Sequence, residues 1–138
     1  MSLVFFTDRD LGKKFPELLR AEGLHVETHA DHFAPTASDE EWLKAIGQRG
    51  WLALTHDHRI RFKPNELAAV MEHRVALLVL IGHTTTTELA TAFIRSRSRI
   101  EKFLERSVPP YIAKVHRPSP AEVRKNPTAR GRIEHWYP

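Results

Sequence analysis

The sequence predicts an α/β fold in which helices cover both faces of a central, mainly parallel β-sheet, a three-layer sandwich. Three observations predict it. Short apolar runs alternate along the chain with amphipathic stretches, which is typical of α/β layer folds. The run from Val75 to Ile81 is apolar throughout, as expected of a strand covered on both faces. A length of 138 residues is enough for one domain with a single sizeable core.

Five strands are expected, in the sheet order 2-1-3-4-5. The first, third and fourth are apolar and suit the interior of the sheet, whereas the second and fifth alternate between apolar and polar residues and suit its edges. In a sheet of this order, ligands bind outside the carboxyl ends of strands 1 and 3. The expected strands span residues 3–6, 24–29, 51–56, 75–81 and 111–116.

Amphipathic helices connect these strands. Four helices are predicted from the spacing of apolar residues, from capping signals, and from the glycines or prolines that would end them. They span residues 11–23, 38–50, 64–73 and 84–106, and the last is the longest. Residues 118–138 mix proline, glycine and basic residues with little periodicity. We therefore expect a domain over residues 1–117 and a basic, extended C-terminal tail over 118–138. That tail should be dispensable for folding, and its terminal aromatic residues should need a partner surface.

Composition narrows the function. The chain has 41% hydrophobic and 28% charged residues, as in ordinary globular proteins. It has no cysteine, which excludes a thiol nucleophile, a thiolate metal site and a disulfide framework. A net charge of +4 and a pI near 9.7 favour polyanionic partners. The longest apolar run is too short to span a bilayer, and the N-terminal apolar stretch lacks a basic start, so we expect a cytoplasmic protein without a membrane partner.

An acidic cluster is the first candidate site. Asp8 ends the first strand and Asp57 follows the third, so both should project into the crevice at the carboxyl ends of these strands. Asp39 opens the second helix, and Asp10 and Glu40 are close by in sequence. Carboxylates gathered without matching cations repel one another, and a hard divalent cation such as Mg²⁺ or Mn²⁺ would offset that cost.

Each acid also has an ordinary structural interpretation. Asp8 and Asp10 could be turn residues or helix N-caps, and Asp39 would complement a helix dipole. Asp57 is the hardest to explain in this way, because nothing in a plain turn requires the sequence Thr-His-Asp there. The case for a site depends on the convergence of the three acids.

The chain resembles the compact branch of the PIN-like nuclease superfamily, with the layout D…(S)D(E)E…LTxD, in two stretches, "FFTDRDLGKKFPELLRAEGLHVET" and "SDEEWLKAIGQRGWLALTHDHR". From the start of the first stretch to the end of the second, the resemblance spans residues 5–59, about 40% of the chain. It implies a metal-dependent ribonuclease, of a kind common among the toxins of bacterial toxin-antitoxin pairs. It also implies that Asp8, Asp39 and Asp57 are catalytic and hold Mg²⁺ or Mn²⁺, and that the Thr55 hydroxyl supports the site.

Arg59 departs from that layout, because many members of the superfamily carry another acid at this position. The departure puts a second metal site in doubt and leaves Asp10 or Glu40 as the candidate fourth acid. His58 or Arg59 could stabilise the phosphate during in-line displacement, and the alternative is that both are ordinary surface residues. Products with a 5′-phosphate are what the resemblance implies.

The last predicted helix is the second candidate site. At about 100° per residue its apolar residues fall on one stripe, and a basic stripe lies about 120° away from it. The basic stripe could follow an RNA backbone. Alternatively it is a solvated helix face, with Glu101 and Glu105 interspersed. The candidate RNA-binding residues are Arg95, Arg99, Lys102 and Arg106.

Three functions remain open from the sequence. The leading one is a PIN-like ribonuclease that acts on RNA and is inhibited by an antitoxin protein; a homodimer is also open. The second is a PIN-like domain that has lost catalysis and only binds RNA or protein, which Arg59 favours. The third is a receiver-type phosphoacceptor domain, which fits poorly because Arg9 separates Asp8 from Asp10 and Lys114 lies in the middle of a strand.

Overall fold

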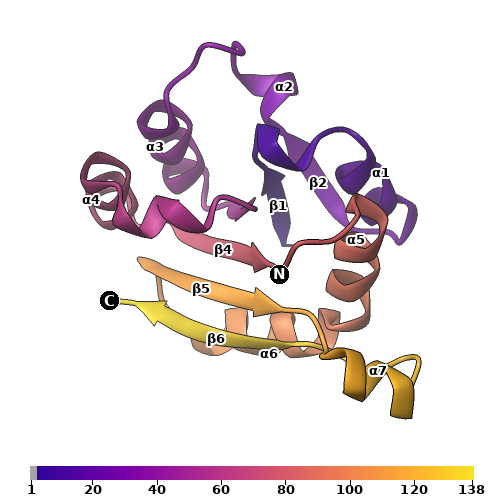
Figure 1. Cartoon of the computed structure of the whole chain (residues 1–138). Coiled ribbons are helices and arrows are strands. Elements are labelled where there is room, and N and C mark those ends of the chain that lie inside the picture. Colours follow the sequence, from indigo (N-terminus) through magenta and orange to yellow (C-terminus); the bar gives the residue numbers. More distant parts are fainter. Residues whose placement is uncertain (1–2) are drawn as a thin grey trace.

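A computed structural model describes residues 3–138 and contains one sheet in the order β2-β1-β3-β4-β5-β6 (Figure 1). The strands are β1 Val4–Thr7, β2 His25–Thr28, β3 Leu52–Thr55, β4 Ala76–Ile81, β5 Tyr111–His116 and β6 Arg132–Tyr137. Strands β1 to β5 run parallel, and β6 runs antiparallel to β5. The predicted α/β fold, the mainly parallel sheet and the order of the first five strands are confirmed.

The four predicted helices are present, but the last of them is divided in two, and two short helices that were not predicted lie at residues 29–32 and 120–125. The helices are α1 Lys14–Ala21, α2 His29–His32, α3 Asp39–Arg49, α4 Pro64–Glu72, α5 Thr86–Arg95, α6 Arg97–Arg106 and α7 Pro120–Lys125, with 3₁₀ turns η1 Arg9–Leu11 and η2 His58–Phe62. The single long helix expected over residues 84–106 is wrong, because the chain breaks at Ser96. Ser96 is buried, and its hydroxyl accepts a hydrogen bond from the backbone N–H of Gly131 at 2.8 Å. The break therefore ties the helices to the C-terminal segment.

Two hydrophobic clusters form the core, one on each face of the sheet. Helices α1, α5 and α6 cover one face, and α3 and α4 cover the other (Figure 1). On β1, Phe5 packs into the first cluster and Phe6 into the second, because successive strand residues point to opposite faces. The apolar run in β4 alternates between the clusters in the same way, as a central strand must. Full burial of each such side chain is worth about 1.5–3 kcal/mol.

The connections after β1 and β3 leave a crevice at the carboxyl edge of the sheet. The chain leaves β1 through α1 on one face to reach β2, and it leaves β3 through α4 on the other face to reach β4. Because the two connections diverge to opposite faces, the ends of β1 and β3 are not covered by a helix. Within residues 3–138, no helix is both long enough and apolar enough to cross a membrane.

The C-terminal segment corrects the sequence prediction of five strands. Residues 132–137 form β6 on the outer edge of β5, so β5 is not an edge strand and these residues are not an extended tail. Ile112 pairs with Tyr137 and the adjacent Ala113 pairs with His135, so Trp136 is an extra residue in β6. Such a bulge interrupts the alternation of a strand, which is why the sequence pattern did not predict one here.

Aromatic packing and one close backbone approach hold β6 in place. Trp136 and Tyr137 pack against the cluster under α3 and α4, and Arg61 lies 4.3 Å from the centroid of the Tyr137 ring. At Gly131 a Cβ atom would lie 1.7 Å from the carbonyl oxygen of His116, so only glycine fits where the chain turns into β6. The terminal aromatic residues thus find their surface on their own domain.

We predict that truncation after Pro118 destabilises the protein, contrary to what the sequence alone suggested. The truncated chain loses the hydrogen bonds of β6 and the packing of Trp136, with an expected loss of about 3 kcal/mol or more in the free energy of unfolding. Thermal melting should show this as a fall of about 10 °C or more in Tm. Val123→Ser, an exposed change on α7, is the control and should leave Tm almost unchanged. Equal Tm values for the truncated and full-length chains would contradict the structural role of β6.

Candidate functional site

Asp8 lies at the carboxyl end of β1 and accepts hydrogen bonds on both carboxyl oxygens. Oδ1 accepts one from the backbone N–H of Arg9 at 2.7 Å, which caps η1. Oδ2 accepts one from Thr55 Oγ1 at 2.9 Å. Only 9% of Asp8 is exposed, and this burial raises the pKa of its carboxyl above the usual value despite the two hydrogen bonds.

Thr55, the last residue of β3, connects three of the predicted acids. Its buried hydroxyl lies 2.9 Å from Asp8 Oδ2 and 3.2 Å from Asp10 Oδ2, and it accepts a hydrogen bond from the backbone N–H of Asp57 at 3.1 Å. A hydroxyl has one proton, so it can donate to only one of these carboxylates at a time. Strand register explains the contact between Thr55 and Asp8. Thr7 of β1 pairs with Leu54 of β3, and Asp8 and Thr55 are the residues that follow this pair.

Asp10 lies beside Asp8, and its carboxylate forms no ion pair within the described residues 3–138. Its Oδ2 accepts a hydrogen bond from the backbone N–H of His56 at 3.0 Å and lies against Thr55. The residue as a whole is exposed, and this oxygen contacts the end of β3. Burial and the neighbouring charge of Asp8 raise the pKa of Asp10 to about 6. Asp10 can therefore hold a proton close to neutral pH.

Asp57 has a different environment, which the sequence did not predict. Oδ1 accepts a hydrogen bond from the backbone N–H of Arg59 at 3.0 Å, and Oδ2 lies 2.7 Å from Lys63 Nζ. Burial alone would raise the pKa of Asp57, but these hydrogen bonds and the positive charges outweigh it and hold the pKa below its usual value. The crowding of like charges that we expected across the acidic cluster is found at Asp8 and Asp10 and not at Asp57.

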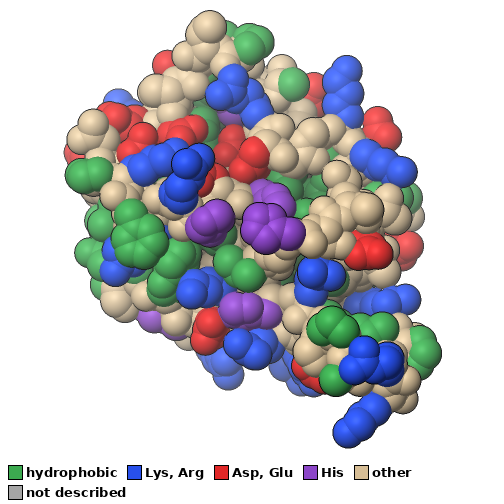
Figure 2. All heavy atoms as spheres, in the orientation of Figure 1, with side chains coloured by type: hydrophobic (Ala, Val, Ile, Leu, Met, Phe, Trp, Pro, Cys, Tyr) green, Lys and Arg blue, Asp and Glu red, His purple; other side chains and the backbone are tan. Residues whose placement is uncertain are grey.

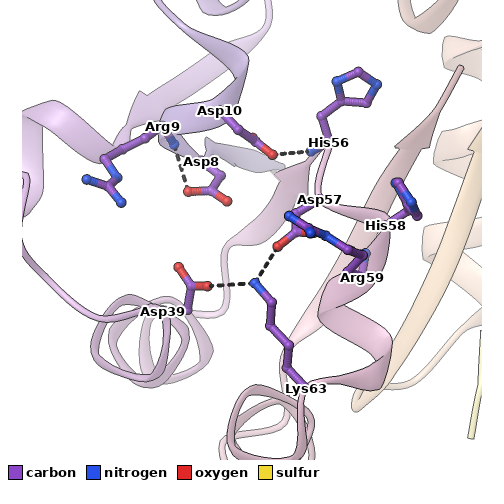
Figure 3. A pocket seen from close by; sticks show the side chains of 9 residues that line it. All are labelled: Asp8, Arg9, Asp10, Asp39, His56, Asp57, His58, Arg59 and Lys63. Carbon is purple, nitrogen blue, oxygen red and sulfur yellow. Dashed lines mark hydrogen bonds and ion pairs between the residues drawn. The ribbon is translucent and has the colours of Figure 1, made fainter. Parts of the chain in front are cut away.

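Asp39, the first residue of α3, faces the same cation. Its Oδ1 accepts a hydrogen bond from the indole Nε1 of buried Trp42 at 3.0 Å, and its Oδ2 lies 4.0 Å from Lys63 Nζ. The amino group of Lys63 therefore lies between Asp39 and Asp57 (Figure 3). Sequence reasoning missed Lys63, since its position just before Pro64 was read only as the start of a helix.

These side chains surround one open depression, which we call the acidic hollow. Its volume is about 650 Å³. Figure 3 shows Asp8, Asp10, Asp39 and Asp57 converging on it from two strand ends and from the start of α3. The residues that line it are Asp8, Arg9, Asp10, Asp39, His56, Asp57, His58, Arg59 and Lys63. The predicted auxiliary residues Asp10, His58 and Arg59 thus lie together with the three predicted catalytic acids.

Glu40 does not belong to this group. It is exposed on α3 and lines a separate depression between α3 and α4, together with Glu41 and Lys44. The helix geometry explains this, because neighbouring residues on a helix point about 100° apart and Asp39 faces the hollow. Of the two candidates for a fourth acid, only Asp10 lines the acidic hollow.

The basic stripe lies away from the acidic hollow. Helix α5 starts near the carboxyl end of β4 and α6 ends at Arg106, shortly before the amino end of β5, so the stripe approaches the opposite edge of the sheet (Figure 1). The break at Ser96 divides the stripe, and Arg99 Nη1 donates a hydrogen bond to the carbonyl oxygen of Gly131 at 2.8 Å. Four side chains make up the stripe, and all are exposed: Arg95, Arg99, Lys102 and Arg106. Their contact with RNA stays a prediction.

The donor set of the acidic hollow suits a hard divalent cation, although its acids are not gathered into a closed ligand cage. The carboxylates offer oxygen atoms only, which Mg²⁺ and Mn²⁺ prefer. Over residues 3–138, no three acidic or histidine side chains are close enough together to hold a metal ion. Lys63 supplies positive charge between Asp39 and Asp57, so a metal at these two acids would have to displace its amino group.

Comparison with known proteins identifies one family. Residues 3–82, more than half of the chain, match the family described as PIN-like domain. No curated protein and no solved structure matches the chain. The matched part contains every acid of the acidic hollow together with Thr55 and Lys63, and it ends before β5 and β6.

We predict a pH-dependent effect of Asp10→Asn on the metal-free protein. Because folding raises the pKa of Asp10 from 3.8 to about 6, the folded state binds this proton more tightly, and the free energy of unfolding falls as the pH rises between these values. The asparagine variant lacks this titration. In EDTA it should melt above the wild type at pH 7, and the difference should vanish near pH 4.

The matched control is Glu40→Gln, which removes a carboxylate of the same region outside the hollow. Asp57 titrates in a different range, because folding lowers its pKa below 3.8. The stability that ionised Asp57 contributes is therefore lost only below pH 3.8. A difference in Tm between Asp10→Asn and wild type that is the same at every pH would contradict the raised pKa of Asp10.

Proposed function

The chain belongs to the PIN-like domain family, and we propose that it is a metal-dependent ribonuclease that hydrolyses the phosphodiester bonds of RNA. The observation that carries the proposal is the convergence of Asp8, Asp10, Asp39 and Asp57 on one open hollow at the carboxyl edge of the sheet. Nuclease activity is common in this superfamily. Mg²⁺ or Mn²⁺ is the cofactor that fits an all-oxygen donor set.

The charge balance of the hollow supports a cation as the missing partner. Lys63 neutralises charge at Asp57 and Asp39, whereas within residues 3–138 Asp8 and Asp10 have no comparable ion pair, and their pKa values are raised. Repulsion between these carboxylates lowers the stability of the folded state. We therefore expect such crowding where a bound ligand relieves the repulsion. A divalent cation bound by Asp8, Asp39 and Asp57 would relieve it.

The protein's own residues have distinct roles in the proposed reaction. When bound, the cation would lower the pKa of the attacking water and offset charge on the phosphate and the leaving 3′-oxygen. Asp10, with a pKa of about 6, can accept a proton near neutral pH. Arg9, His58 and Arg59 line the hollow and can contact phosphate oxygens. Lys63, once released from Asp57, can do the same.

A PIN-like domain without catalysis is the second candidate, and two observations favour it. Arg59 replaces an acid that many members of the superfamily carry, and Lys63 already lies between Asp39 and Asp57. A receiver-type domain has less support, because the amino group of Lys114 lies over the Trp136 ring rather than in the acidic hollow. An antitoxin partner, a homodimer and a cytoplasmic location stay predictions.

We predict that Asp8→Asn and Asp57→Asn each reduce RNA cleavage in Mg²⁺ or Mn²⁺ by at least about 100-fold, because each removes a charge that holds the cation. Cleavage of a fluorescent RNA measures this, with Glu40→Gln as the control that keeps near wild-type activity. Metal-free Asp57→Asn should lose at most about 1 kcal/mol of stability, because its ion pair with Lys63 reaches solvent. Normal cleavage by both variants would overturn the nuclease proposal.

We also predict that Lys63→Gln binds Mn²⁺ more tightly than the wild type. The metal then no longer competes with the amino group for Asp57, and a gain of about 1 kcal/mol corresponds to about fivefold in Kd. Calorimetric titration with Mn²⁺ measures the change without reference to activity. Lys44→Gln, on α3 outside the acidic hollow, is the control. Weaker binding by Lys63→Gln would show that Lys63 does not compete with the metal.

A further inference from the structure

A second hollow lies directly beside the acidic hollow, and the two share His56 and His58 as a common wall. We call it the aromatic hollow; its volume is about 320 Å³. Figure 2 shows histidine side chains at the surface with acidic side chains on one side and hydrophobic ones on the other. His56 is fixed in this wall, since its Nε2 lies 2.8 Å from the carbonyl oxygen of Gly82.

The walls of the aromatic hollow are mainly apolar. Phe62, Leu80, Ile81 and Trp136 contribute them. The Phe62 and Trp136 rings meet edge to face, with centroids 5.9 Å apart and planes inclined by 79°. Despite this contact Phe62 is 68% exposed, which is unusual for a phenylalanine. Two aromatic rings thus face an open space next to the acidic hollow.

Positive charge accompanies the aromatic walls. The amino group of Lys114 lies 4.2 Å from the centroid of the Trp136 ring, and His83 adds a further ring at the rim. None of the residues that line this hollow is acidic. A ligand that suits this hollow is flat and apolar in one part and negatively charged in another. A nucleotide has both properties.

We propose that the aromatic hollow is a nucleobase subsite, which holds one unpaired base of a single-stranded RNA while a neighbouring phosphate lies in the acidic hollow. The inference rests on the proposed function and adds to it a binding site for one base of the substrate. Continuity of the two hollows through His56 and His58 allows one strand to occupy both. A base inside a duplex is stacked and paired and cannot enter such a space.

One side of the subsite comes from outside the family match. Phe62 lies within residues 3–82, but Lys114 on β5 and Trp136 on β6 lie beyond them. Trp136 is the extra residue at the bulge of β6, and the bulge places it on the same face as Tyr137. The C-terminal strand therefore both completes the sheet and supplies one wall of the subsite.

The test measures RNA binding without metal, so that cleavage plays no part in it. A fluorescent single-stranded RNA hexamer is titrated in EDTA and followed by anisotropy, with the same hexamer annealed to its complement and an abasic hexamer as comparison ligands. Phe62→Ala should weaken binding of the single strand by at least about tenfold, because it removes an exposed stacking surface without opening the core. Binding of the abasic hexamer should hardly change.

A second measurement places the base at Trp136. The hexamer should quench tryptophan fluorescence of the wild type, and Trp136→Phe should remove most of this quenching, since Trp42 is buried in the core and Trp51 lines neither hollow. Val108→Ala, at an exposed residue outside both hollows, is the control for Phe62→Ala. Equal affinity of Phe62→Ala and wild type for the single strand, or equal affinity of the wild type for single strand and duplex, overturns the proposal.

The outcomes separate this inference from the proposed function. If the wild type cleaves RNA with metal and Phe62→Ala binds the hexamer normally, the nucleobase subsite is wrong and the nuclease stands. If Phe62→Ala loses hexamer binding and no variant or wild type cleaves RNA, the subsite stands and the nuclease proposal fails. Wild-type protein that does not bind the hexamer overturns the subsite.

Discussion

The Thr55 hydroxyl is the contact on which the arrangement of the acidic hollow depends. It lies at the end of a buried strand and contacts Asp8 and Asp10 on one side and the backbone of Asp57 on the other. A buried carboxylate such as Asp8 is costly unless donors reach it, and Thr55 supplies one of its two hydrogen bonds. Because parallel pairing sets β1 against β3, the fold itself determines where this hydroxyl meets the acids.

The acids of the hollow fall into two electrostatic halves. Asp39 and Asp57 share Lys63, and the pKa of Asp57 is lowered. Asp8 is buried at the end of β1 and Asp10 contacts the end of β3, and the loss of solvation at these carboxyl groups raises both pKa values. Asp57 therefore stays ionised to lower pH, whereas Asp8 and Asp10 retain protons more readily. A phosphate-cleaving site can use both properties, since it needs charge to hold a cation and a group that exchanges a proton.

The sequence predicted the parts of the structure that depend on local pattern. Strand order followed from the difference between continuous and alternating apolar runs, and the convergence of Asp8 and Asp57 followed from that order. Lys63 was missed because a long flexible side chain can reach several acids. Which acid its amino group contacts depends on the tertiary structure. The sixth strand was missed because a bulge at Trp136 interrupts the two-residue alternation of the strand. The break at Ser96 was missed because its hydrogen-bond partner, Gly131, is distant in sequence.

The pairing of β6 with β5 has a consequence for the synthesis of the chain. β5 is made first, and the segment between His116 and Arg132 must follow before β6 can pair with it. Until residues 132–137 have left the ribosome, β5 presents a row of unpaired backbone N–H and C=O groups at the margin of an otherwise complete sheet. A nascent chain at this stage offers an edge that a chaperone can shield or that a second nascent chain can pair with.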